Sequence, residues 1–214
     1  MSENEKDFSE LINSLSEHAD ENKPLRAPIW RALFYFVLTA AYIVGTMIYS
    51  GLRHDWAEVM RETGFVFEMA MSLLIWISAI IAAAWLCVPD MRGQNWLKTV
   101  PYTLISVFTL WVIIRGYTEG THFQPFHFEH CVEHGLLVAS IPLILVIFMA
   151  RQGATTQPYH MAVMNGLVIA SIGWLTLRLS CSMDDVGHGL FFHFLPLFVC
   201  GVIVGVFARK LFRW

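Results

Sequence analysis

Apolar residues along this 214-residue chain occur in long continuous blocks separated by short polar segments. Blocks of about eighteen or more apolar residues are long enough to cross the hydrocarbon core of a membrane as α-helices. Six blocks reach this length: Trp30–Leu52, Phe65–Val88, Val100–Tyr117, Val132–Ala150, Ala162–Leu179 and Leu190–Ala208. The pattern therefore predicts an all-α, six-transmembrane-helix bundle over residues 29–214.

A different pattern precedes the first block, where residues 1–28 form a polar, acidic tail. Its apolar residues recur at helical spacing opposite acids and amides, and they are Phe8, Leu11, Ile12 and Leu15. The tail lacks the basic start and apolar core of a secretory signal peptide. The spacing predicts an amphipathic helix that either lies on the membrane or docks on a soluble partner. Surface helices favour a basic polar face, so the acidic face here favours the partner.

Composition agrees with a membrane protein, because 56% of the residues are hydrophobic and only 14% are charged. A soluble domain of this size needs a more polar surface. The net charge of −3 lacks the basic footprint of a nucleic-acid-binding protein, so we expect no direct contact with nucleic acid.

The distribution of lysine and arginine predicts the orientation of the helices, because short cytoplasmic loops are enriched in both. Ten lie at one set of helix ends: Lys6, Lys23, Arg26, Arg31, Arg92, Lys98, Arg151, Arg209, Lys210 and Arg213. Four lie at the other: Arg53, Arg61, Arg115 and Arg178. We therefore expect both termini in the cytoplasm and the loops 53–64, 118–131 and 180–189 outside.

Two of these outward loops concentrate metal-binding residue types. Around the start of the fourth block, four of them fall at i, i+3, i+4 and i+7, on one face of a helix: His127, His130, Cys131 and His134. The loop after the fifth block supplies four more: Cys181, Asp184, Asp185 and His188. Cys131, His134, Cys181 and His188 form a candidate Cys2His2 site for Zn²⁺ or another soft divalent metal.

Three interpretations of these residues remain open. In the first, the histidines and acids are hydrated polar side chains at the membrane interface, and the cysteines are small apolar residues that fill space. The second is a disulfide between Cys131 and Cys181, which requires their Cα atoms to lie within about 7 Å. The third is the metal site. The second and third share one consequence, since either would tie the fourth helix to the loop after the fifth.

Ionisable residues within the apolar blocks are few and need partners, because unpaired charge is costly in a membrane. Glu68, near the outward end of the second block, is expected to pair with Arg178 or Arg115. Arg178 lies one turn before Cys181 and would favour its thiolate. For Arg115 we expect the side chain to extend to the lipid headgroups instead.

No catalytic constellation stands out in the sequence, and we expect a protein that is not an enzyme. The alternative is a small b-type haem or metal-binding membrane redox protein, with His134 and His193 as axial ligands. A transporter is disfavoured, because the block interiors lack the ionisable residues and broken helices that mark a substrate path.

Several segments, in order, carry a resemblance over nearly the whole chain. They are the tail "LINSLSEHADENKPLR", "HCVEHGLL" opening the fourth block, "RLSCSMDD" closing the fifth, "FFHFLP", and the terminal "ARKLFRW". With six blocks joined by short connections, the chain resembles the NrsF-like family of polytopic membrane anti-sigma factors.

The resemblance implies a bacterial inner-membrane protein that holds an extracytoplasmic-function sigma factor inactive. It also implies that Cys131 and Cys181 sense metal or oxidative stress. In the resulting hypothesis, residues 1–28 bind the sigma factor through Phe8, Leu11, Ile12 and Leu15. A chemical event at the two cysteines changes helix packing and lowers the affinity of the tail for its partner, with Glu68 and Arg178 in support.

Overall fold

The computed structural model describes residues 12–14, 26–88, 94–120, 130–151 and 155–211, except for the side chains of 130–132, 150, 151 and 208–211. Within these ranges the chain is helical and contains no strand. The helices are α2 (Pro28–Ser50), α3 (Trp56–Val59), α4 (Thr63–Leu86), α5 (Trp96–Glu119), α6 (His130–Arg151), α7 (Pro158–Ser180), α8 (Val186–His188), the π-helix η1 (Gly189–Phe194) and α9 (Leu195–Leu211).

The predicted helical membrane bundle is confirmed by these elements. The described helices include five that are long and apolar enough to cross a membrane, and the last of these joins α8, η1 and α9 from Val186 to Phe207. The remaining predicted span, the fourth block at Val132–Ala150, corresponds to α6, which has a described apolar stretch of Glu133–Met149. Each predicted block lies within or close to one of these helices, and the boundaries differ by a few residues.

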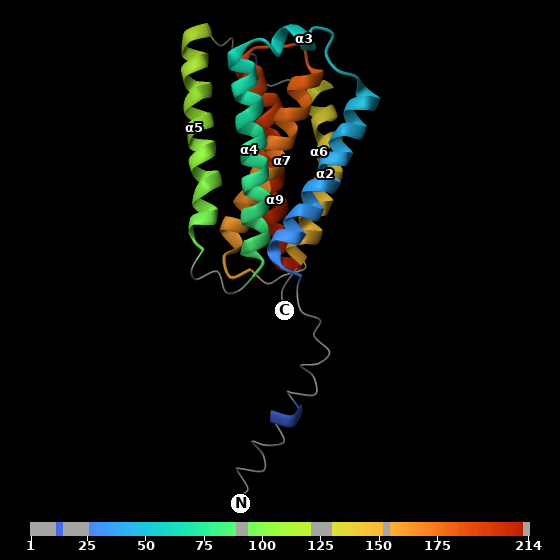
Figure 1. The fold of residues 1–214 in the computed structure, drawn as a ribbon, viewed down its shortest axis with the longest axis vertical. Helices are drawn as coiled ribbons and strands as arrows, with labels where there is room; N and C mark the ends of the chain where they lie inside the picture. Colours follow the sequence, from blue (N-terminus) through green and yellow to red (C-terminus); the bar gives the residue numbers. More distant parts are fainter. Residues whose placement is uncertain (1–11, 15–25, 89–93, 121–129, 152–154, 212–214) are drawn as a thin grey trace, which may run out of the picture.

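Helix α7 forms the centre of the bundle (Figure 1). It packs against α9, α4 and α6, and α5 covers the far side of α4. In its most apolar window 83% of α7 is buried, compared with 17% of α5 and 22% of α2. The outward faces of α2 and α5 instead expose large apolar side chains such as Ile48 and Ile113. Such faces suit contact with lipid, whereas α7 is enclosed by its neighbours in the bundle.

Small residues allow α7 and α9 to approach at the level of the backbone. A Cβ atom on Gly201 would lie 2.7 Å from the Cα of Gly166, and one on Gly205 would lie 2.6 Å from the Cα of Ala162. Lipid supplies no hydrophobic drive for helix association, so close van der Waals contact through small residues has to supply it. The glycine pairs thus hold α9 against the central helix.

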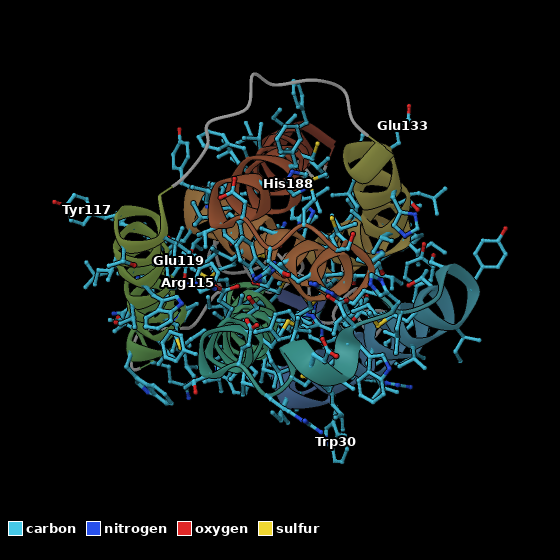
Figure 2. The ribbon with its side chains drawn as sticks, turned by 90° about the horizontal axis from the view of Figure 1, so that it is seen from above. Trp30, Arg115, Tyr117, Glu119, Glu133 and His188 are labelled. Carbon is cyan, nitrogen blue, oxygen red and sulfur yellow. The ribbon has the colours of Figure 1, made fainter. Side chains whose placement is uncertain are left out.

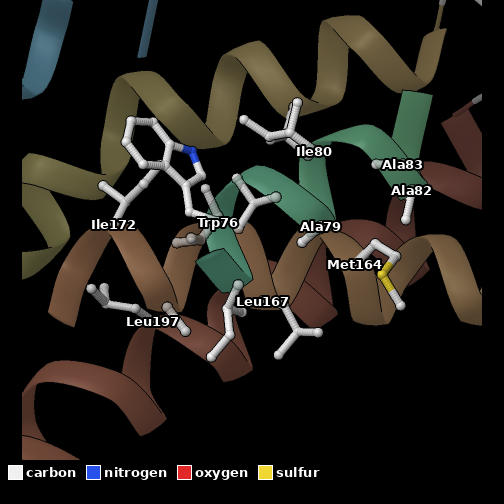
Figure 3. Close-up of a cluster of buried hydrophobic side chains, with 14 of the residues drawn as sticks. Trp76, Ala79, Ile80, Ala82, Ala83, Met164, Leu167, Ile172 and Leu197 are labelled. Atoms are coloured by element: carbon white, nitrogen blue, oxygen red, sulfur yellow. The ribbon is translucent and has the colours of Figure 1, made fainter. Parts of the chain in front are cut away.

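A cluster of buried apolar side chains fills the space between α4, α7 and α9 (Figure 3). Alanines on one face of α4, including Ala79, Ala82 and Ala83, are fully buried. Met164 and Leu167 of α7 and Leu197 of α9 pack into the same cluster. The small α4 side chains let the larger ones of α7 and α9 interlock.

The two ends of the bundle differ. At one end, called here the α3 end, lie α3, the end of α5 and the start of α6 (Figure 1). The start of α2 and the end of α9 lie together at the opposite end, called here the tail end. An even number of spans returns the chain to the side where it started. This arrangement agrees with the expectation that both termini lie on the same side of the membrane.

Candidate functional site

Arg53, in the connection between α2 and α3, organises the loop that follows α7. Its side chain is fully buried, and its guanidinium donates to both carboxylate oxygens of Asp184 at 2.7 Å. It also donates to both oxygens of Asp55, at 2.7 and 2.8 Å. Bidentate arginine–carboxylate pairs fix geometry as well as charge. The backbone N–H of Arg53 donates to the carbonyl of Leu179 at 2.9 Å, which binds the same connection to the end of α7.

These contacts shift the protonation of the loop carboxylates. The hydrogen bond from Arg53 lowers the pKa of Asp55 to about 2. The same guanidinium, helped by Arg178, lowers the pKa of Asp184, although partial burial opposes the shift. The pKa of Arg53 is raised, chiefly by the hydrogen bonds to Asp55 and then Asp184. Charge pairing therefore holds this loop at neutral pH.

The network continues into the bundle through Glu68 of α4, which is fully buried. Arg178 of α7 donates to Glu68 at 3.2 Å and to Asp184 at 3.0 Å. Arg115 of α5 also pairs with Glu68, and it binds Glu119 at 2.8 Å. The expected pair of Glu68 with Arg178 is present. The expectation that Arg115 extends to the headgroups is wrong, because Glu68 lies at the same depth on the neighbouring helix.

Together these residues form a continuous arginine–carboxylate chain across the α3 end of the bundle. Its members, in order of contact, are Asp55, Arg53, Asp184, Arg178, Glu68, Arg115 and Glu119. The chain joins α5, α4 and α7 to the loops on either side of them. Seen from the α3 end, Arg115 and Glu119 lie on α5, whereas Tyr117 of the same helix points outward (Figure 2).

Beside this chain, three potential metal ligands meet where α7 ends and the last span begins. Cys181 caps the end of α7, and its backbone N–H donates to the carbonyl of Leu177 at 2.7 Å. The Cys181 Sγ lies 3.8 Å from the Nε2 of His188. His193 completes the group, and the ligand atoms of all three residues lie within 4.8 Å of one another. These residues are called here the Cys181–His188–His193 cluster.

The π-helix η1 positions the two histidines of this cluster. Within η1 the backbone contains a wider turn, and the N–H of Leu195 donates to the carbonyl of Leu190. The rings of His188 and His193 meet edge to face with centroids 4.9 Å apart. His188 lies inside the ring of helices in Figure 2, unlike Glu133 and Trp30, which point away from it. Single π-turns in helices often occur at functional positions.

Of the four predicted metal ligands, the structure brings Cys181 and His188 together. His134 is partly exposed and is not part of the Cys181–His188–His193 cluster. The side chain of Cys131 lies outside the described residues. His193 was considered in the sequence only as a haem ligand, since its distance from Cys181 follows from the π-turn rather than from spacing. The metal assignment therefore remains a prediction.

The position of Cys131 along α6 is nevertheless defined by the packing one turn away. A Cβ atom on Gly135 would lie 2.9 Å from the Cδ1 of Leu177 and 3.7 Å from the Cδ1 of Leu197. Cys131 is four residues before Gly135, and Cys181 is four residues after Leu177. Residues four apart share a helix face. The contact at Gly135 thus packs the first turns of α6 against the end of α7.

At the tail end, a buried arginine connects α2 to α6. Arg31 of α2 is only 4% exposed, and its Nη2 donates to the carbonyl of Met149 in α6 at 2.9 Å. The thiol of Cys87, at the end of α4, donates to the same carbonyl at 3.5 Å. In the sequence Arg31 is recognisable only as a positive charge that indicates the cytoplasmic side, because its burial depends on how three helices meet.

The predicted tail residues are mostly outside the described structure. Phe8, Leu11 and Leu15 lie outside the described residues, while Ile12 lies in a helical turn over residues 12–14 with 53% of its surface exposed. The boundary between a tail of residues 1–28 and a bundle of residues 29–214 therefore stays a prediction.

Fold and site together define a class: a multi-pass helical membrane protein with a charged, histidine- and cysteine-containing cluster at one end of its bundle. A family model described as NrsF, negative regulator of sigma F, matches residues 15–214, and the chain belongs to this family. It is thus a negative regulator of a sigma factor, or anti-sigma factor. No curated protein and no solved structure matches the chain.

Proposed function

We propose that this protein is an anti-sigma factor of the bacterial inner membrane that sequesters an extracytoplasmic-function sigma factor through its cytoplasmic tail. It releases the sigma factor when the outward-facing Cys131 and Cys181 respond to metal or oxidative stress. The observation that carries the proposal is the family match over residues 15–214, which includes the whole membrane bundle and both cysteines. This regulatory role requires no catalytic step.

The tail is the segment best suited to hold the sigma factor. It precedes α2, and its apolar stripe includes Ile12, which is exposed and therefore available to a partner. Its acidic face disfavours binding to anionic lipid. An amphipathic helix of this kind typically binds by placing its apolar face in a groove of a soluble partner.

Packing of α6 against α7 supports the sensing role. The contacts of Gly135 with Leu177 and Leu197 bring the start of α6 toward the end of α7, where Cys181 lies. A disulfide or a shared metal ion between Cys131 and Cys181 would tie α6 to the loop after α7. Either event supplies several kcal/mol, which is about the amount needed to change a bound population into a free one.

Helix α6 offers a direct route from the cysteines to the tail. It starts at His130, next to Cys131, and its Met149 carbonyl accepts the hydrogen bond from Arg31. Arg31 lies in the first turn of α2, immediately after the tail. A movement of α6 along or about its axis would therefore alter the anchor of the helix that carries the tail.

Orientation follows from the charge count, and the fold is consistent with it. Arg26 and Arg31 lie at the tail end with the start of α2, and three of the four arginines of the α3 end, Arg53, Arg115 and Arg178, are paired with carboxylates in the chain described above. Paired arginines contribute less free positive charge than unpaired ones. The α3 end is accordingly the one that we assign to the periplasm.

Co-purification tests the tail assignment. The intact protein, extracted from membranes, should carry a bound sigma factor, and Leu11→Asp or Leu15→Asp should remove it by placing a charge on the apolar stripe. Asn13→Asp is the matched control, because Asn13 lies on the opposite side of the helix and should leave binding intact. A sigma factor that stays bound to both leucine variants would exclude docking through this stripe. Its absence from the wild-type protein would count against sequestration itself.

A further inference from the structure

The strongest unassigned feature of the molecule is His193, a histidine with no exposed surface inside an apolar bundle. Neither of its ring nitrogens has a hydrogen-bond partner with ordinary distance and angle in the described part of the chain, and the polar group that interacts with the ring is the thiol of Cys181. A buried polar atom without a partner carries a cost in free energy, and such exceptions in native proteins have a reason. The groups that surround the His193 ring indicate why it is buried.

What surrounds it is the thiol of Cys181 and the imidazole of His188. A metal ion of the zinc type binds sulfur at about 2.3 Å and imidazole nitrogen at about 2.0 Å, which places the two ligand atoms roughly 3.6 Å apart in a tetrahedron. The Cys181 Sγ and His188 Nε2 are already 3.8 Å apart. The third ligand atom, from His193, lies within 4.8 Å of both, so a shift of about 1 Å would complete the geometry.

We propose that Cys181, His188 and His193 form a binding site for a borderline divalent cation such as Zn²⁺, with one coordination position left for another donor. Zn²⁺ binds well to thiolate and imidazole donors, whereas carboxylate and carbonyl oxygens suit harder cations such as Mg²⁺ and Ca²⁺. The site would satisfy the buried ring of His193 and use the π-turn, which otherwise interrupts regular helix packing. His193 thereby replaces His134 in the donor set expected from the sequence.

The surroundings also support a rigid site. The ring of His188 stacks on Phe192 with centroids 4.8 Å apart, and Asp185 caps α8, the short helix that contains His188, by accepting from the N–H of Gly187 at 3.0 Å. The carbonyl of His193 lies against α7, where a Cβ on Gly173 would be 3.0 Å from it. Ligands on such fixed elements bind a metal with little reorganisation.

The inference deepens the proposed sensing at Cys181, but metal binding can be measured without any sigma factor. We suggest titrating the purified, metal-stripped full-length protein in lipid nanodiscs with Co²⁺. We expect one ion per chain, intense tetrahedral d–d bands, and a thiolate-to-cobalt charge-transfer band that Zn²⁺ abolishes by displacement. Cys181→Ser should remove the charge-transfer band, and His188→Asn or His193→Asn should weaken binding at least ~100-fold, since even outer partners of ligands change affinity 10- to 100-fold.

Two controls match these variants in chemistry and differ in position. Cys200→Ser removes a thiol from α9, and His134→Asn removes a histidine from α6; both should leave the cobalt spectrum unchanged. Binding that survives His193→Asn, or that is lost in His134→Asn, would overturn the assignment. So would a wild-type protein that binds no cobalt, whereas failure of sigma co-purification alone would leave the metal site standing.

A second measurement guards against variants that fail to fold. A chain that keeps Cys181 and carries serine at its other three cysteines should be alkylated by maleimide more slowly when Zn²⁺ is present. The protection should disappear when His188→Asn is added to that chain. Equal alkylation rates with and without Zn²⁺ would exclude the site.

Discussion

Arg53 shows how much one side chain can organise. It lies in the five-residue connection between α2 and α3, residues 51–55, yet its buried guanidinium binds Asp55 and Asp184 and its backbone N–H binds the end of α7. The same loop, residues 181–185, supplies Cys181 to the Cys181–His188–His193 cluster. The geometry of the cysteine therefore depends on an arginine more than a hundred residues away in sequence.

This dependence predicts acid sensitivity of the loop. The pKa of Asp184 is lowered in the folded protein, so its stabilising effect is complete above its ordinary pKa of 3.8 and is lost as the pH falls through the lower folded value. We expect Asp184→Asn to cost about 1 kcal/mol at neutral pH, since solvent screens this half-exposed carboxylate, and to flatten the acid limb of a plot of melting temperature against pH. Glu62→Gln, which removes an exposed carboxylate that makes no ion pair among the described residues, should change neither. An unchanged acid limb in Asp184→Asn would contradict the role given to this pair.

At the scale of single residues, the sequence predicted some of the ion pairs and missed others. It predicted that Glu68 needs a cationic partner, because a carboxylate inside an apolar block has few alternatives. It did not predict that Arg115 joins the same carboxylate, nor that Arg53 is buried. Both depend on which helices become neighbours and on how a loop folds back, and neither is encoded by local spacing.

At the scale of elements, the hydrophobic blocks predicted the helices well because crossing a membrane imposes a minimum length and a near absence of charge. The π-turn over Gly189–Phe194 was not predictable in the same way. One additional residue in a turn leaves the apolar pattern intact, yet it rotates His193 relative to His188. The sequence therefore predicted Cys181 and His188 of the Cys181–His188–His193 cluster as ligands of one site, but it did not place His193 with them.

Packing between α7 and α9 yields a second prediction. Gly201→Ala would place a methyl group 2.7 Å from the Cα of Gly166, and backbone cannot move aside as a side chain does. We expect a loss of about 1–3 kcal/mol of stability, typical of overpacking, seen as a lower melting temperature in detergent. Gly45→Ala in α2 is the control, because nothing lies within 4 Å of its Cβ position. Equal melting temperatures for the two variants would mean that α9 is not held against α7 by this contact.

For the whole molecule, the central question is how an event at the α3 end reaches the tail. Two described hydrogen bonds link the tail-bearing helix α2 to α6, from Tyr42 to the carbonyl of Leu137 and from Arg31 to the carbonyl of Met149, and the second lies next to the tail. Mutations of residues that couple two sites typically change the coupling by 0.5–2 kcal/mol, or about 2- to 30-fold.

We therefore expect Arg31→Met to lower the induced-to-uninduced ratio of sigma-dependent transcription about 2- to 30-fold while the sigma factor still co-purifies. A transcriptional reporter exposed to metals and oxidants measures this ratio. Arg26→Met removes an exposed arginine just before α2 and should respond as the wild-type protein does, whereas Cys131→Ser and Cys181→Ser should abolish the response. Normal induction in Arg31→Met would exclude this anchor as the route of coupling, and normal induction in both cysteine variants would exclude the sensor.

The buried carboxylate of Glu68 also has a consequence for biogenesis. A chain is synthesised from its N-terminus, so α4 reaches the membrane before Arg115 is made and well before Arg178. A lone charge within a membrane helix costs about 3 kcal/mol on insertion scales, and α4 cannot settle at its final depth while that charge is unpaired. Helices α4 and α5 should thus enter the bilayer as a hairpin joined by the Glu68–Arg115 pair, and α7 should enter afterwards against a partner that is already in place. The order of the chain thereby sets the order of assembly.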